Sequence, residues 1–148
     1  MKQAQELCDV TVYPDDSGYT TKWVCDGLNE DVNWVGANLT LSIKLKGELI
    51  GGLIYNDLRP NVDVWWTIYT TDKRWASRHI LRYCFDVAFN LMNCRRISLF
   101  VSKDNHKSLN LVEKLGFKRE GLLRQYRDDG SDCYLYGMLK NECKWRSK

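Results

Sequence analysis

Three basic side chains stand at the predicted start of a helix. Lys73, Arg74 and Arg78 follow a strand-like run that ends at Tyr69, and an apolar pattern of helical period comes directly after them. A helix N-terminus already carries partial positive charge, so further cations there are unfavourable unless an anion is present. Free backbone N–H groups and basic side chains that converge on one point favour a phosphate site. The alternative interpretation is a solvated basic turn capped by Asp72.

A polar pair follows the next predicted strand. Asn105 directly precedes a short helix predicted over residues 106–115, and Ser108 lies in its first turn. Asn is a preferred N-cap residue. Ligands of open sheets gather at the carboxyl ends of parallel strands, so the loops at 70–77 and 102–105 are the places where chemistry is expected.

The elements that must position these loops are strands alternating with helices. Apolar side chains alternate with a period of two in the strands and follow a helical period in the two longer helices. The predicted strands are 39–46, 49–55, 62–69, 96–101, 117–127 and 132–139, and the predicted helices are 75–92 and 106–115. Residues 56–61 are predicted to form a loop. Gly51-Gly52 predicts a bulge or a close approach of the backbone to a neighbouring element, and Asp128-Asp129-Gly130 predicts a tight hairpin. Residues 1–38 are less legible, with an edge strand near 9–13 and a weak helix near 20–31.

This order predicts an α/β (α+β) domain. Strand, helix and strand over 62–101 make a parallel pair inside a mostly antiparallel mixed sheet, with helices on both faces. The 148 residues fit one domain, with 39–148 as its core. No apolar run is long enough for a membrane span or a secretory signal, so a cytoplasmic protein is expected.

Cysteine spacing and charge exclude several classes of site. The six cysteines have wide, irregular spacings and there are only two histidines, which predicts buried reduced thiols and no metal centre. A net charge of +3 is too small to make nucleic acid the leading partner, although the six tryptophans could stack on bases.

The segment after Asn105 resembles a known family. Asn105 and Ser108, followed by Lys114-x-Gly116-Phe117 and Glu120-Gly121, look like the second conserved motif of the GNAT superfamily of N-acyltransferases. The tail over 136–145 resembles the end of the branch that contains the ribosomal-protein N-terminal acetyltransferases. The resemblance runs from Leu39 to the C-terminus, about three quarters of the chain.

The resemblance implies a fold and a set of site residues. The strand over 62–69 would splay from its parallel neighbour, and the cleft would hold the pantetheine arm of acetyl-CoA. The positions implied for acetyl-CoA are Ile68, Tyr69, Thr70, Lys73, Arg74, Trp75, Ala76, Ser77, Arg78, Asn105 and Ser108. Of these, Asn105 and Ser108 would also be catalytic, and the amides near 68–70 would polarise the thioester carbonyl.

The chain departs from the family pattern at two points. The pyrophosphate loop of the family is rich in glycine, whereas residues 73–79 contain none, and Val112 replaces a tyrosine that often protonates the leaving thiolate. No general base stands out. The candidates for that base are Glu48, Asp57, Asp63 and His106, and the candidates for an acceptor pocket are Tyr55, Trp65 and Tyr69.

The resulting hypothesis is an N-acetyltransferase that moves acetyl from acetyl-CoA to a primary amine by direct transfer in a ternary complex. The acceptor is a protein N-terminus, a lysine or a small amine, and a homodimer is one expected assembly. The alternative is a GNAT-fold binding module without acyl-CoA activity, with a protein or nucleic-acid partner. The missing glycines and the missing tyrosine support that alternative.

Overall fold

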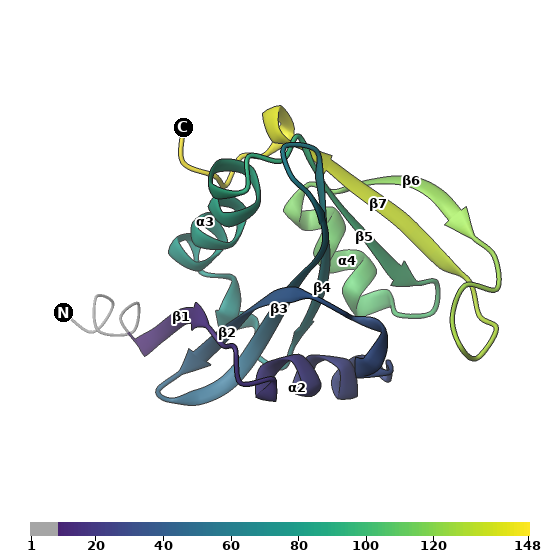
Figure 1. Ribbon diagram of the computed structural model, residues 1–148, viewed down its shortest axis with the longest axis horizontal. Helices are drawn as coiled ribbons and strands as arrows, with labels where there is room; N and C mark the ends of the chain where they lie inside the picture. The colour runs from purple at the N-terminus through teal and green to yellow at the C-terminus, as the bar shows by residue number, and fades with distance from the viewer. Residues whose placement is uncertain (1–8) are drawn as a thin grey trace.

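One mixed sheet organises the protein. The computed structural model describes residues 9–148, and in it seven strands lie in the order β1-β2-β3-β4-β5-β7-β6 (Figure 1). The strands are β1 (Val10–Pro14), β2 (Asn38–Leu45), β3 (Glu48–Arg59), β4 (Asp63–Thr70), β5 (Arg96–Ser102), β6 (Lys118–Leu123) and β7 (Cys133–Leu139). β4 and β5 are parallel, and every other neighbouring pair is antiparallel. The predicted fold class is confirmed.

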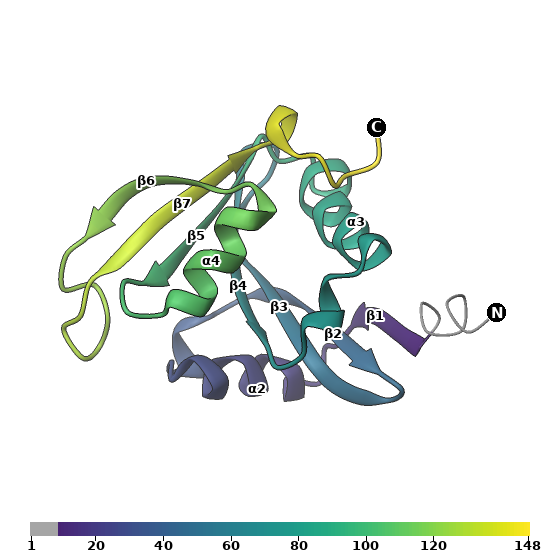
Figure 2. The same cartoon turned by 180° about the vertical axis from the view of Figure 1, so that it is seen from behind.

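Helices cover both faces of this sheet. They are α2 (Tyr19–Leu28), α3 (Arg78–Asp86), which a π-helical turn over Val87–Leu91 continues, and α4 (His106–Leu115). Leu53 and Tyr55 of β3 pack in one buried cluster with residues of α3 and α4, while Ile54 between them packs with α2. Since successive strand residues point to opposite faces, α3 and α4 share one face and α2 lies on the other. Figure 2 views the molecule from the side on which α4 is in front.

The helix predicted over 75–92 is broken into pieces. A 3-10 turn over Lys73–Ala76 comes first, and Ser77 is extended with φ −63° and ψ 152° before α3 begins at Arg78. Asp72 caps the turn, because its carboxylate accepts from the N–H of Arg74 at 2.9 Å. Trp75 is buried in the core. The buried indole anchors the turn as a separate element, which apolar periodicity alone did not predict.

Two further boundaries differ from the prediction. β3 continues to Arg59 instead of ending at 55, and the extra residues contain a register irregularity with Asp57 at φ +52°. The Asp-Gly turn does form, since the N–H of Arg127 donates to the carbonyl of Ser131 at 3.1 Å, but it lies within a loop over 124–132. Both segments are irregular, and both line a pocket described below.

The Gly51-Gly52 pair forms the bulge and the close approach that the sequence predicts. The register of β2 against β3 shifts next to Gly51, between Ile43 and Lys44. A Cβ at Gly52 would lie 2.4 Å from the side chain of Val24 and 2.9 Å from that of Thr20. The absence of a side chain at Gly52 therefore lets α2 lie directly on β3.

Gly52→Ala is expected to destabilise the fold by about 1–3 kcal/mol, because the new methyl group forces α2 away from the sheet. Gly121→Ala is the matched control, since a Cβ there meets nothing within 4 Å. Urea unfolding of the two variants checks the prediction. Equal midpoints would contradict it.

The five cysteines that the structure describes are buried free thiols, as predicted: Cys25, Cys84, Cys94, Cys133 and Cys143. Burial raises the pKa of Cys25 to about 11 and that of Cys84 to about 12, so both stay protonated and inert at neutral pH. Cys8 lies outside the described residues. Between residues 9 and 148, no helix is long and apolar enough to span a bilayer.

Candidate active site

The parallel strands β4 and β5 separate soon after they begin. Their register covers only three residue pairs, which are Asp63 with Arg96, Val64 with Ile97 and Trp65 with Ser98. Beyond Ser98, β5 keeps its pairing with β7 on the other side. The two strands therefore form a V that opens toward their carboxyl ends, as the family resemblance implies.

The open part of the V leaves backbone hydrogen-bonding groups without a strand partner. The carbonyl of Val62 accepts from the N–H of Arg96 at 3.1 Å, so even-numbered residues of β4 face β5. The N–H of Thr71 donates to the carbonyl of Ile50, so odd-numbered residues face β3. The backbone groups that point into the V past the paired segment are those of Trp66, Ile68 and Thr70.

Tyr69 lies outside this cleft, contrary to its predicted place in the acetyl-CoA site. Its backbone pairs with Gly52 of β3 because it is odd-numbered in the same alternation. Its ring packs against Trp23 at 5.1 Å between centroids and lies over Gly27, where a Cβ would collide with it. Tyr69 therefore helps to dock α2 instead of facing a ligand.

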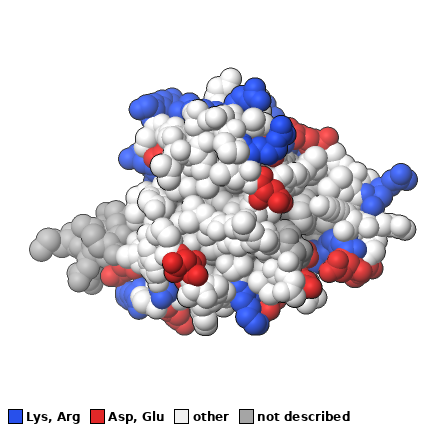
Figure 3. Space-filling model, viewed as in Figure 1, with Lys and Arg blue, Asp and Glu red and all other residues white. Residues whose placement is uncertain are grey.

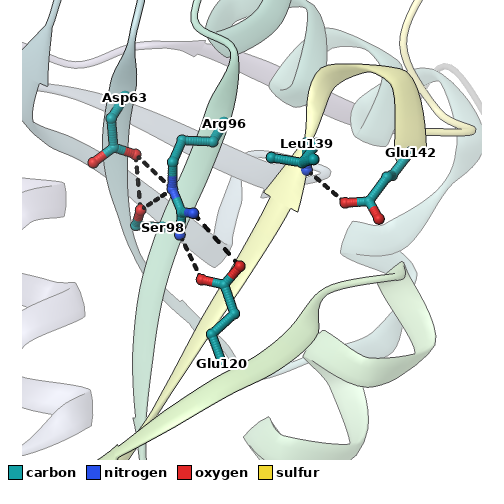
Figure 4. Close-up of polar contacts among 6 residues, drawn as sticks. All are labelled: Asp63, Arg96, Ser98, Glu120, Leu139 and Glu142. Carbon is teal, nitrogen blue, oxygen red and sulfur yellow. Dashed lines mark hydrogen bonds and ion pairs between the residues drawn. The ribbon is translucent and has the colours of Figure 1, made fainter.

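A polar network holds the closed end of the V (Figure 4). Arg96 donates from Nε to the hydroxyl of Ser98 at 2.9 Å, and that hydroxyl donates to Asp63 at 2.8 Å. The same guanidinium reaches Glu120 of β6 at 2.7 Å, passing over Gly137, where a Cβ would lie 2.5 Å from it. The network ties β4, β5 and β6 together where β4 and β5 are paired. Asp63 thus serves the sheet and lines neither pocket of the site, so it is not placed as a base.

The V contains a narrow cleft with a cavity volume of about 50 Å³. Asn105, Ser108 and Val112 of the α4 region line it together with Trp66 and Ile68 of β4. Asn105 caps α4 by accepting from the N–H of Ser108 at 3.2 Å. The structure therefore brings both predicted polar residues to the cleft. The indole N–H of Trp66 is also buried and has no hydrogen-bond partner.

The basic turn lies where β4 leads into α3. Lys73 and Arg78 are exposed, whereas the guanidinium of Arg74 forms an ion pair with Asp72 at 2.6 Å. The side-chain hydrogen bond from Arg74 is the main cause that lowers the pKa of Asp72 to about 2. The first N–H groups of an α-helix have no partner within the helix. At the start of α3, Ser77 provides no side-chain cap for them. Ala76 and Ser77 are half-buried, and Trp75 is in the core, which leaves its indole unable to stack on a ligand.

A second, wider pocket of about 740 Å³ lies beside the cleft, and we call it the outer pocket. Its wall comes from the end of β3, from β4, from the segment after α2 and from the β6–β7 loop. The residues that line both the cleft and the outer pocket are Glu30, Trp66, Thr67, Phe100 and Arg127. Two chambers thus meet at one junction.

Sequence analysis predicted no site role for the five junction residues, of which Glu30 is the one with a carboxylate. Its carboxylate pairs with Arg127 at 3.3 Å, and the two side chains are only 15% and 19% exposed. Burial raises the pKa of Glu30 above its ordinary 4.5, and the charge of Arg127 partly opposes that change. Glu30 lies in the least legible part of the sequence, and its partner is distant along the chain. Neither residue belongs to a local motif that could have marked it.

The other predicted candidates are divided among different places. Asp57 and Trp65 line the outer pocket. Glu48 stands exposed at the start of β3, and His106 is the exposed first residue of α4. Tyr55 is buried, and its hydroxyl donates to the carbonyl of Cys84 at 2.6 Å. Tyr55 therefore belongs to the core and lines neither the cleft nor the outer pocket, and its burial raises its pKa well above 10.

Comparison with known proteins decides the family. The model of the Acetyltransferase (GNAT) family matches residues 9–117, well over half of the chain. The chain belongs to this family. The Uncharacterized N-acetyltransferase p20 of Bacillus licheniformis is 37% identical to this GNAT chain over 73 residues, or 47% of it. The chain spans only 40% of the length of that relative.

Solved structures share the fold. A mutant of spermidine N-acetyltransferase SpeG from Vibrio cholerae superposes with a TM-score of 0.71 at 16% identity, covering 90% of this chain and 95% of that one. A dodecameric structure of spermidine N-acetyltransferase from the same organism gives 0.68 at 17% identity, covering 90% and 95%. In neither comparison is the identity high enough to carry more than the GNAT architecture. Among residues 9–148 no group of three or more His, Cys, Asp or Glu could hold a metal ion.

The sequence prediction that Arg78 binds phosphate implies that Arg78→Ala raises the Kd for acetyl-CoA about tenfold, because a charge-assisted contact would be lost. Arg74→Ala should have a smaller effect, since Asp72 already holds that guanidinium. Lys22→Ala, which removes an exposed lysine of α2 on the other face of the sheet, is the control. Calorimetric titration with acetyl-CoA measures all three, and equal affinities for the Arg78 and Lys22 variants would refute the assignment.

Proposed function

We propose that the protein transfers an acetyl group from acetyl-CoA to a primary amine, directly and within a ternary complex. The observation that carries the proposal is the V between β4 and β5. Its unpaired backbone groups at Trp66, Ile68 and Thr70 continue into the basic turn and the free N–H groups at the start of α3. An elongated thioester donor with a pyrophosphate needs this combination of extended hydrogen-bonding edge and anion site.

Residues on the α3 and α4 side would hold the donor. The β4 backbone would pair with the pantetheine amides, and Lys73 and Arg78 would contact phosphate. The indole N–H of Trp66 is a buried donor without a partner, which suits a carbonyl oxygen on which negative charge develops. Acetyl-CoA supplies an activated acyl group. The 3-10 turn over Lys73–Ala76, capped by Asp72, would take the place of the glycine-rich loop of the family.

Glu30 would act as the general base. A primary amine arrives as an ammonium ion, and Glu30 accepts one proton, which frees the nitrogen to attack the thioester carbon. The C–N bond forms, the C–S bond breaks, and the second amine proton goes to the departing thiolate through the Ser108 hydroxyl. A buried carboxylate with a raised pKa is better matched to this proton transfer than a solvated one.

The acceptor is a small primary amine in this proposal. The outer pocket holds four carboxylates against two guanidinium groups, and an excess of negative charge attracts a cation. The structural neighbours named spermidine N-acetyltransferases support a small amine. The branch that acetylates ribosomal-protein N-termini, a lysine acceptor and a homodimer stay predictions from the sequence. A binding module without acyl-CoA activity is the competing outcome of the experiments below.

Purified protein is expected to bind acetyl-CoA saturably and to release CoA only when a primary amine is added. Titration followed by tryptophan fluorescence measures the first, and a thiol assay measures the second. Saturable binding without amine-dependent release would favour the non-catalytic module. The absence of binding at millimolar acetyl-CoA would refute the assignment of the V as a donor site.

Glu30→Gln is expected to lower kcat by about 10²- to 10⁴-fold and to leave acetyl-CoA affinity unchanged, because only proton transfer is lost. In the unmodified protein the rate should fall as pH drops through the raised pKa of Glu30, since the base must be ionised. The variant should lack this acidic limb. Glu113→Gln, which removes an exposed carboxylate from another ion pair, is the control. An unaltered pH profile in the Glu30 variant would exclude it as the base.

A further inference from the structure

The side chain of Asn56 carries one of two buried polar atoms that have no hydrogen-bond partner in the described part of the chain. Asn56 is 3% exposed and lines the outer pocket. Its Nδ2 donates to the carboxylate of Asp57 at 3.1 Å, which fixes the orientation of the amide, because the opposite orientation would bring two oxygens together. Oδ1 therefore remains as an unsatisfied acceptor. A buried acceptor without a partner costs free energy unless a ligand donates a hydrogen bond to it.

The charges around Asn56 indicate what kind of ligand would do so. The carboxylates of the outer pocket are Glu30, Asp31, Asp57 and Asp128, and its cations are Arg59 and Arg127. Arg127 is already paired with Glu30. A hydrogen-bond acceptor beside an excess of carboxylates favours a cationic N–H donor. The carboxylates come from three segments, with Glu30 and Asp31 adjacent, and within residues 9–148 they form no metal-binding group, which suits an extended cation better than a metal ion.

The position of Asn56 relative to the junction sets the distance between the two nitrogen atoms of a bound ligand. Asn56 lies opposite Trp65 in the β3–β4 register, and Thr67 of the junction is two residues further along β4. Two strand residues span about 7 Å. In a ligand that reaches both places, a short chain of methylene groups would therefore join the cationic nitrogen at Asn56 to the nitrogen at the junction.

We propose that Asn56, assisted by Asp57, binds a second cationic nitrogen of the acceptor, so that the substrate is a diamine or polyamine and not a simple monoamine. This inference rests on the proposed acetyl transfer and names its substrate class. The primary amine that reacts lies at the junction beside Glu30, and the second nitrogen donates to Oδ1 of Asn56. Asn56 is then a specificity-determining residue, since it contacts a part of the acceptor that does not react.

Steady-state rates with 1,4-diaminobutane and with n-butylamine test the proposal, because the two differ only by the second nitrogen. The unmodified protein should prefer the diamine about tenfold or more in kcat/KM. Asn56→Leu, similar in size but without an acceptor, should reduce this preference about tenfold, mainly by raising KM for the diamine. Asn56→Asp, which keeps an acceptor oxygen, should retain the preference. Asn110→Ala, an exposed asparagine on α4, is the control.

The ratio between the two amines is the readout, since damage to the fold lowers both rates together. Equal preference in the unmodified protein and in Asn56→Leu would overturn the role of Asn56. CoA release with neither amine would instead refute acetyl transfer to such acceptors. Calorimetric titration with 1,4-diaminobutane alone then decides the inference. Saturable binding lost in Asn56→Leu supports it, and binding that is absent, or unchanged in that variant, overturns it.

Discussion

The short pairing between β4 and β5 is the constraint on which the site depends. Three residue pairs join the strands, and the network of Asp63, Ser98, Arg96 and Glu120 holds them at that end. Beyond this point, each strand pairs only with its other neighbouring strand, β3 or β7. Backbone groups that would otherwise form hydrogen bonds between β4 and β5 therefore have no strand partner. The fold thus leaves an unpaired backbone edge inside the sheet, and no particular side chain is needed to form it.

The charged groups of the site differ between the two faces of the sheet. On the α3 and α4 side, Asn105 and Ser108 line the cleft, and the basic turn over Lys73–Ala76 follows β4, while carboxylates predominate in the outer pocket on the α2 side. In the proposed reaction, an anionic donor and a cationic acceptor would approach from opposite faces and meet at the junction. In Figure 3, basic side chains gather along the upper edge, over the C-terminal residues and the end of α3, and the middle of that face carries few charged groups. This distribution gives that face no broad basic surface for nucleic acid.

The ion pair between Glu30 and Arg127 links segments that the sheet keeps apart. Glu30 follows α2, and Arg127 belongs to the long β6–β7 loop. The guanidinium of Arg127 also donates to the carbonyl of Leu28 at 3.2 Å. The pair closes the outer pocket over the sheet and partly buries a carboxylate. That burial raises the pKa of Glu30, while the charge of Arg127 in the same contact partly opposes the change.

The sequence by itself determined the mixed sheet, the parallel pair, the cap at Asn105 and the extent of the helix over 106–115, because these depend on local periodicity and turn chemistry. It also located the basic turn and the Asn105–Ser108 pair. Tertiary structure alone decided that Tyr69 turns away from the cleft, that Trp75 is buried and that Asp63 is held in the sheet. It alone brought Glu30, Arg127 and Asn56 to one pocket. Register and burial are set by strands distant in the chain, so no local pattern encodes which side chains converge.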